Sequence, residues 1–411
     1  MKTQNLFSKD FTLVLLGQII SLFGNAILRF ALPLYLLRET GSATLFGIVT
    51  ACSFLPMIIL SFLGGVLADR VNKRNIMVTL DFLTALIIIV LLITLDTFPI
   101  VPLFIVVLML LYGISGTYQP TVQASIPALV STNNILPAGA IINQVSALAN
   151  LLGPIIGGML FGTFGIIPIL IISIICFILS AVMELFIHIP YEKRCDNAGI
   201  FTIIKTDMNE SVNYLKNENP ILIKIIALIA IFNLVLTAMM IVGLPILIID
   251  TLKMSDSLLG ISQGVLALGG LCGGIFAAVI SKKLTLQNSY ILLFLCSTCI
   301  IVMAAPLLLN TPAMVSYLII TISSFVIMGL ATIFSIQMIA TVQTETPPEL
   351  VGKIIALMMS LSMCAQPIGQ TLYGFFFDKL NNNPGIILLI AGIISIIIAI
   401  TSKKIFKNIK S

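Results

Sequence analysis

Long apolar stretches follow one another along almost the whole chain, and they constrain its fold more than any other feature. The sequence is 59% hydrophobic and 9% charged, whereas a soluble globular domain is about one-quarter charged. A membrane-spanning helix needs about 20 apolar residues. Twelve such stretches can be delimited, at 11–37, 44–68, 76–95, 100–126, 138–161, 165–188, 221–249, 258–280, 290–309, 313–339, 352–377 and 385–402. We therefore predict an all-α membrane protein with twelve transmembrane helices.

The basic residues predict which side of the membrane each loop faces. An even number of spans puts both termini on one side, and Lys and Arg are enriched in cytoplasmic loops. With cytoplasmic termini, 17 of the 21 basic residues fall in cytoplasmic segments, and the outer loops hold Arg38, Lys253 and Lys379. The first span is too long for a signal sequence and has no small-residue cleavage site after it, so we expect it to be retained. Both termini are therefore predicted to be cytoplasmic.

The longest polar interval divides the predicted helices into six and six. We predict an N-terminal six-helix bundle over 1–188, a cytoplasmic linker over 189–220 and a C-terminal six-helix bundle over 221–411. A short amphipathic helix is expected in the linker, near 199–216.

The two halves also share short segments in the same order. Residues 64–71 align with 277–284, and the pattern Thr-Val-Gln-x-x-x-Pro occurs at 121–127 and again at 341–347. Duplicated helical halves are typical of transporters, whose substrate site lies at the interface between the repeats.

Two predicted helices carry polar side chains at spacings of three or four, which places them on one helical face. These side chains are Gln18, Ser21, Asn25 and Arg29 in the first helix, and Tyr112, Ser115, Gln119 and Gln123 in the fourth. Amides are costly in hydrocarbon and normally face protein or a cavity. We interpret the two stripes, together with Asn233 and Gln337 in the second half, as the lining of a substrate cavity. Hydrogen bonding between packed helices is the alternative interpretation.

Few charged residues fall within the predicted helices. Arg29 is a candidate counter-charge for a substrate or for a coupling acid. Asp81 and Glu184, near the cytoplasmic ends of the third and sixth helices, are candidate proton carriers. Anchoring at the membrane interface, or pairing with the basic loop, is the alternative for both acids. Asp378 is expected to be an ordinary outer-loop carboxylate.

The fifth predicted helix contains Gly153-Pro154-Ile-Ile-Gly157-Gly158. Gly153 and Gly157 form one small face that permits close helix contact, and Pro154 removes a backbone hydrogen bond and permits a bend. Gln366 and Pro367 occupy the corresponding position in the second half. We predict that these two helices act as gates.

The sequence lacks the motifs of an ATP-driven pump or of an enzyme. Without G-x-x-x-x-G-K-[ST], transport would have to draw on an ion gradient or a partner. Gly260-Ile-Ser262-Gln-Gly264 matches G-x-S-x-G, but a nucleophile elbow needs a preceding strand, and this stretch opens an apolar helix. Cys296-x-x-Cys299 has no second Cys or His pair beside it. We expect no enzymatic activity, no cofactor, no metal site and no nucleic-acid partner.

Several motifs resemble those of the major facilitator superfamily. The charged segment 65–74, GVLADRVNKR, resembles the superfamily's loop 2–3 signature, G-x-L-a-D-R-x-G-r-K/R. The GPxxGG at 153–158 resembles the core of its antiporter motif. The stretches 16–42, 120–130 and 341–353 are similar to the drug-exporter branch that includes macrolide efflux proteins and the enterobactin exporter. The resemblance covers essentially the whole chain.

This resemblance implies a conformational lock on the cytoplasmic face. In the superfamily, charge contacts of this loop help to hold the outward-facing state, which implies that role for Gly65, Asp69, Arg70, Lys73 and Arg74. Ordinary positive-inside charges are the alternative.

This sequence departs from the family pattern in three places. The pattern's second Gly is Asn72, a residue that also adopts the left-handed conformation. Lys282 stands opposite Asp69 in the second half, so the lock would be asymmetric. The fourth helix lacks the membrane arginine of many drug/proton antiporters, which weakens the expectation of standard proton coupling.

The function implied is secondary active export of small amphipathic organic compounds, such as macrolides, across a bacterial cytoplasmic membrane. We expect the lipid bilayer, a small-molecule substrate and the proton gradient as partners, and a functional monomer. One rival hypothesis is export of a specific metabolite or siderophore, in which Arg29 would meet an anionic group. Another is a non-transporting membrane protein such as a sensor, which the absence of an appended domain disfavours.

Overall fold

A computed structural model describes residues 6–189, 200–280, 286–347, 350–380 and 383–407. Within these residues the secondary structure is helical and contains no strand. Twelve of the described helical segments are long and apolar enough to cross a membrane, which confirms the predicted fold class. The described part of the linker contains the expected helix, α7, over Ile200–Asn217.

The contacts divide the chain into two compact units. Unit 1 consists of Met1–Gly41, Val49–Asn197 and Asp256–Gly264. Unit 2 consists of Ser42–Ile48, Ala198–Ser255 and Val265–Ser411. The first turns of α2 therefore belong to unit 2 and the first turns of α9 to unit 1, so each unit includes a short helical segment from the opposite half of the sequence.

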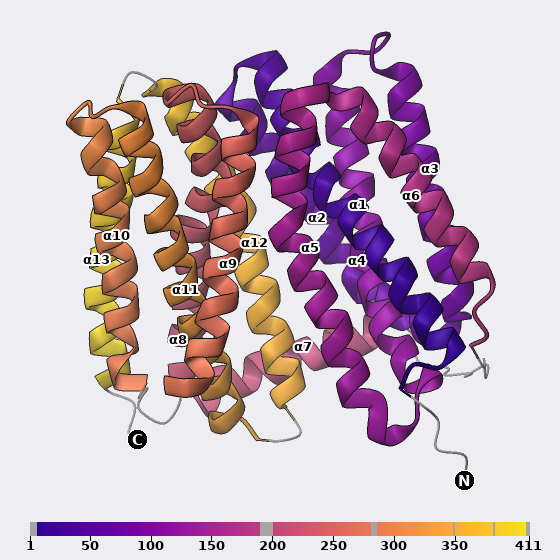
Figure 1. The fold of residues 1–411 in the computed structure, drawn as a ribbon. Helices are drawn as coiled ribbons and strands as arrows, with labels where there is room; N and C mark the ends of the chain where they lie inside the picture. Colours follow the sequence, from indigo (N-terminus) through magenta and orange to yellow (C-terminus); the bar gives the residue numbers. More distant parts are fainter. Residues whose placement is uncertain (1–5, 190–199, 281–285, 348–349, 381–382, 408–411) are drawn as a thin grey trace. The chain divides into compact units, whose positions relative to one another are not determined.

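Unit 1 contains most of the helices of the first half. Their bounds are α1 Lys9–Thr40, α2 Ala43–Arg70, α3 Lys73–Thr94, α4 Ile100–Leu129, the short η1 Thr132–Asn134, α5 Ile135–Phe164 and α6 Ile166–Leu185. Helix α1 packs against both α5 and α6, and α3 lies alongside α6 (Figure 1). Helices α1, α3, α4 and α6 thus surround a common interior.

Unit 2 contains most of the helices of the second half. Their bounds are α7, α8 Pro220–Phe232, η2 Asn233–Thr237, η3 Met239–Gly243, η4 Ile246–Thr251, α9 Asp256–Ile280, η5 Leu286–Asn288, α10 Ser289–Leu308, α11 Ala313–Glu345, α12 Val351–Lys379 and α13 Pro384–Lys407. Helices α10 and α13 lie side by side (Figure 1). The seventh span is unusual because α8 continues into the three π-helical segments η2, η3 and η4. Such widened turns occur often at functional sites.

Two helix ends illustrate how local residues set the boundaries. Gly41 ends α1 with a backbone φ of 58°, a left-handed conformation that glycine adopts without steric cost. Asn72 begins α3 as its N-cap, because its side-chain oxygen accepts a hydrogen bond from the backbone N–H of Arg74. Its φ of −60° is not left-handed. The tolerance of Asn at this motif position therefore comes from helix capping, which corrects the sequence-based explanation.

Candidate functional site

The most distinctive polar feature of unit 1 is a pair of buried acids on α3 and α6. The Oγ of Ser21 donates a hydrogen bond to Oδ1 of Asp81 over 3.2 Å. The hydroxyl of Tyr118 donates to Oε1 of Glu184 over 2.6 Å. Ser180, on α6, lies beside Asp81, and its hydroxyl donates to the carbonyl oxygen of Gly17. We call these five residues, Ser21, Asp81, Tyr118, Ser180 and Glu184, the carboxylate cluster.

The two carboxylates are fully enclosed, and neither is paired with a described cation. Asp81 is 1% exposed and Glu184 is 0% exposed. Among the described residues no Lys or Arg forms an ion pair with either acid, and one oxygen of each carboxylate has no hydrogen-bond partner. The two acids are close enough to interact electrostatically. Neither acid forms an ion pair with Lys73 or Arg74, the members of the basic loop whose side chains are described.

Arg74, a described member of the basic loop, contacts a backbone carbonyl and not one of the two acids. The guanidinium of Arg74 donates to the carbonyl oxygen of Leu185, the residue after Glu184. Lys73 and Arg74 lie in the first turn of α3. The side chains of the other predicted lock residues, Gly65, Asp69 and Arg70, lie outside the described residues.

A cluster of buried apolar side chains lies next to the carboxylate cluster. It includes Phe11 and Val14 of α1, Met77 of α3, Val122 of α4 and Tyr118 itself. Phe11, Val14, Met77 and Val122 are each 0% exposed. The ring of Tyr118 therefore belongs to the apolar cluster while its hydroxyl reaches Glu184, so this residue joins the two.

The two predicted polar stripes meet within unit 1. The guanidinium of Arg29 lies over the ring of Tyr112, 4.2 Å from its centroid, and the Tyr112 ring packs edge-on against Phe54. The buried Nε of Arg29 has no hydrogen-bond partner among the described residues. The guanidinium thus lies over an aromatic ring, and no described carboxylate forms an ion pair with it.

Four other residues of the two stripes are buried or half-buried. Gln18 is 0% exposed, and both polar atoms of its amide lack a partner in the described residues. Asn25 donates a hydrogen bond to the carbonyl oxygen of Ser21, one turn earlier. Ser115 and Gln119 of α4 are half-buried. Ser21 thus links the stripe to the carboxylate cluster, a connection that the spacing alone does not reveal.

The remaining predicted site residues lie in three other helices and one π-helical segment. Gly153 and Gly157 of α5 face α1, against Ala26 and Phe30, whereas Gly158 faces Gly260 of α9. Pro154 lies within α5. In unit 2, Asn233 begins η2, Gln337 is half-buried in α11, and Gln366 and Pro367 are buried in α12.

Two sets of contacts at the α1–α2 turn are not predictable from the local sequence. Asp378 accepts hydrogen bonds from Ser42 Oγ, Ala43 N and Thr44 N over 2.7–2.8 Å, so it caps the N-terminus of α2. Arg38 donates to Asp256 through Nε at 3.0 Å and Nη2 at 2.7 Å. Asp378 is thus a helix-capping residue rather than an ordinary loop carboxylate. A cap contributed by a residue 336 positions away leaves no signal in local sequence.

The family of the chain follows from comparison with known proteins. Residues 14–370 match the model of the Major Facilitator Superfamily. The chain belongs to this superfamily. It is therefore a transporter and not an enzyme, and the twelve apolar helices among the described residues make it a multi-pass protein of a bacterial membrane.

Its relatives include drug and siderophore transporters of this superfamily. Macrolide efflux protein A of Streptococcus pyogenes is 25% identical over 407 residues, which cover 97% of this chain and 96% of the relative. Multidrug efflux pump Tap of Mycolicibacterium fortuitum is 24% identical, covering 89% and 88%. The Staphyloferrin A transporter of Staphylococcus aureus is 22% identical, covering 71% and 70%.

Solved structures show the same fold. The nucleoside transporter NupG superimposes with a TM-score of 0.73 over 97% of this chain and 100% of that one, at 15% identity. At 15% identity this similarity shows that the two chains share a fold, and it carries no information about the substrate of this chain.

Proposed function

We propose that this chain exports bulky, weakly polar or cationic organic molecules across the bacterial cytoplasmic membrane, driven by proton entry. The carboxylate cluster carries the proposal. An uncompensated charge is costly in a membrane interior, so two buried acids that are paired with no described cation favour holding a proton until water reaches them. A group that loads a proton in one state and releases it in another can couple transport to the proton gradient.

Helix α1 offers a physical connection between proton and substrate. Ser21 of α1 contacts Asp81, whereas Arg29 lies eight residues further along, which is about 12 Å of helix. A change of protonation that breaks the Ser21–Asp81 hydrogen bond would bias the position of α1, and with it the polar stripe. Near-full-length similarity to a macrolide efflux protein and a multidrug efflux pump supports the substrate class.

The experiment that tests this proposal is uptake of labelled macrolides, cationic dyes and siderophores into inverted membrane vesicles, with and without a protonophore. We expect protonophore-sensitive uptake of a macrolide or dye. Asp81→Asn and Glu184→Gln should abolish the protonophore-sensitive part at unchanged membrane abundance. Asp96→Asn, in an exposed carboxylate of the turn after α3, is the matched control and should transport normally. Uptake that survives collapse of the gradient would contradict proton coupling, and uptake of neither macrolide nor dye would contradict the substrate class.

A second candidate function is export of an anionic metabolite or siderophore. Arg29 favours it, because this half-buried cation has a buried Nε without a described hydrogen-bond partner and could meet a carboxylate. Here Arg29→Gln should abolish uptake of the siderophores in the same panel, and Arg29→Lys should restore part of it. If Arg29→Gln leaves siderophore uptake unchanged while macrolide uptake changes, the drug-export function stands alone.

A further inference from the structure

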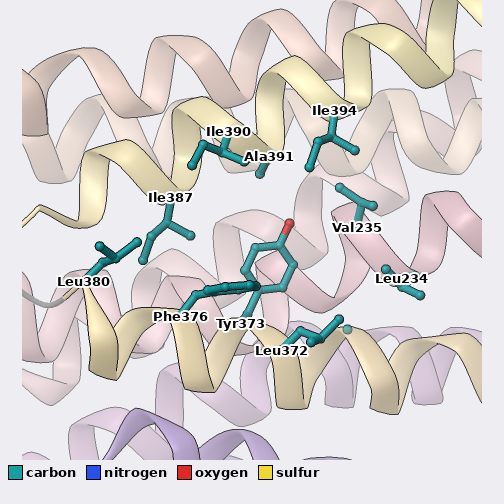
Figure 2. Close-up of a pocket in the computed structure, with 11 residues that line it drawn as sticks. Leu234, Val235, Leu372, Tyr373, Phe376, Leu380, Ile387, Ile390, Ala391 and Ile394 are labelled. Carbon is teal, nitrogen blue, oxygen red and sulfur yellow. The ribbon is translucent and has the colours of Figure 1, made fainter.

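A cavity of about 230 Å³ lies within unit 2, and none of the site residues described above is among its lining residues. It is formed by η2, α12 and α13 (Figure 2). Gly369 brings α12 into close contact with the backbone of Leu234 in η2, where an added Cβ would overlap the Leu234 carbonyl oxygen. The ring of Tyr373 extends from α12 toward α13 (Figure 2).

The lining is apolar apart from one hydroxyl group. Leu, Ile, Val, Ala and Phe side chains form the walls, with Ile387, Ala391 and Ile394 contributed by α13. The hydroxyl oxygen of Tyr373 points into the space between α12 and α13 (Figure 2), and Tyr373 is 8% exposed. A lining of this kind suits a hydrocarbon chain and offers nothing to orient a polar molecule.

The side chains at the rim of the cavity indicate that the hydrocarbon of the bilayer reaches it. Leu372 and Phe376 on α12, and Ile390 and Ile394 on α13, are exposed apolar side chains. In a multi-pass membrane protein, exposed apolar side chains on such helices contact the hydrocarbon of the bilayer. The cavity is also smaller than the roughly 300–1,000 Å³ of sites that enclose drug-sized ligands. Its size therefore fits part of an acyl chain better than a whole macrolide.

A basic residue precedes Leu380 of the cavity wall in the sequence. Lys379, the last residue of α12, adjoins Leu380 of the cavity wall and is exposed. Its ammonium lies 5.4 Å from the centroid of the Phe375 ring. Lys side chains at helix ends reach the headgroup region, where a lipid phosphate supplies the opposite charge.

We propose that the cavity between η2, α12 and α13 binds one acyl chain of a bilayer phospholipid whose phosphate is held by Lys379. The acyl chain fills the space that the widened turn of η2 leaves beside α12 and α13. The bound lipid is then a structural partner of unit 2, whichever substrate the protein carries.

The absence of tryptophan from the chain allows a direct test. Tyr373→Trp creates a single fluorescent reporter in the cavity, in protein reconstituted into phosphatidylcholine vesicles with or without brominated acyl chains. Phe377→Trp, at a 2% exposed position on α12, is the buried control, and Ile397→Trp, at a 58% exposed position on α13, is the lipid-exposed control. Contact with a brominated chain should quench the reporter at 373 as strongly as the one at 397. Quenching as weak as at 377 would overturn the proposal.

Two further arms identify the occupant. Quenching at 373 should be stronger with brominated phosphatidylglycerol than with phosphatidylcholine, and Lys379→Gln should remove that difference. Relief of quenching by saturating macrolide would overturn the proposal in favour of a substrate pocket.

A measurement on the native cavity avoids dependence on the folding of Tyr373→Trp. Native mass spectrometry of the unsubstituted chain should detect a retained phospholipid. Ala391→Leu, which fills the cavity, should lose that lipid, whereas Ile397→Leu should keep it. Equal retention by both variants would overturn the proposal.

Discussion

Asp81 and Glu184 place two carboxylates in the interior of unit 1, where the groups that donate to them are hydroxyls. A hydroxyl donor stabilises a carboxylate without neutralising it, in contrast to the cation of an ion pair. The hydrogen bond from Tyr118 to Glu184 is 2.6 Å long, shorter than the 3.2 Å hydrogen bond from Ser21 to Asp81. This residue therefore controls how readily Glu184 can stay charged, although it carries no charge itself.

Tyr118→Phe tests this at the scale of one atom, because the ring stays in the apolar cluster and only the hydroxyl is lost. A hydrogen bond to a charged group contributes about 1.5–3 kcal/mol, which corresponds to a change in equilibrium of tenfold or more. We expect protonophore-sensitive uptake to fall by about that factor at unchanged membrane abundance. Tyr290→Phe on α10 is the matched control. Uptake at the parent rate in Tyr118→Phe would exclude the hydroxyl from the proton path.

Helices α1 and α5 approach each other so closely that a single carbon atom decides their spacing. The small residues at 153 and 157 in α5 face Ala26 and Phe30 of α1. Membrane helices associate through such small-residue faces, because hydrocarbon provides no hydrophobic drive to bring them together. The predicted gate helix is therefore in direct contact with the helix that carries the polar stripe.

Gly153→Ala should separate α1 from α5, because the new Cβ would overlap the Cβ of Ala26. Overpacking of this kind costs about 1–3 kcal/mol. We expect a lower midpoint of unfolding when the purified variant is titrated with a denaturing detergent. Ala26→Gly in the same chain should restore the midpoint, because it returns the lost space. If the double variant unfolds as early as the single one, the contact between these two residues does not set the spacing.

The positions of the transmembrane helices were predictable from the sequence. Their π-helical turns, the direction of their buried side chains and their long-range caps were not. A span must supply about 20 apolar residues, so the twelve windows determine where helices lie. Widening into η2, η3 and η4 follows from no local pattern, because a run of apolar residues does not distinguish a rare π-helical turn from an α-helical one. The inward direction of Asp81 and Glu184 depends on which neighbour each helix packs against. The cap of α2 by Asp378 joins residues from opposite halves of the sequence, and only the fold brings them together.

The proposed alternating-access cycle concerns the whole molecule, because it would require contacts between residues of the two sequence halves to form in one state and break in another. The Asp378 cap on α2 and the Arg38–Asp256 ion pair are contacts of this type, both at the predicted outer side. A helix cap contributes about 1 kcal/mol, and a partly exposed ion pair about 0–1 kcal/mol. Contacts of this size bias two nearly balanced states without fixing either. Asp69, at the predicted cytoplasmic side, is proposed to favour the opposite state.

Asp378→Asn and Asp69→Asn should therefore shift the molecule in opposite directions. A single reporter, Asn25→Cys in a cysteine-free background, can be labelled in intact cells with a membrane-impermeant maleimide. Losing a cap of about 1 kcal/mol changes the ratio of two states about fivefold. We expect faster labelling from outside in Asp378→Asn, because the outward-open state gains population, and slower labelling in Asp69→Asn. Asp96→Asn should label at the parent rate. Equal labelling rates in all variants would contradict this prediction. So would a change of the labelling rate in the same direction in Asp378→Asn and Asp69→Asn, because the two carboxylates are assigned to stabilise different states.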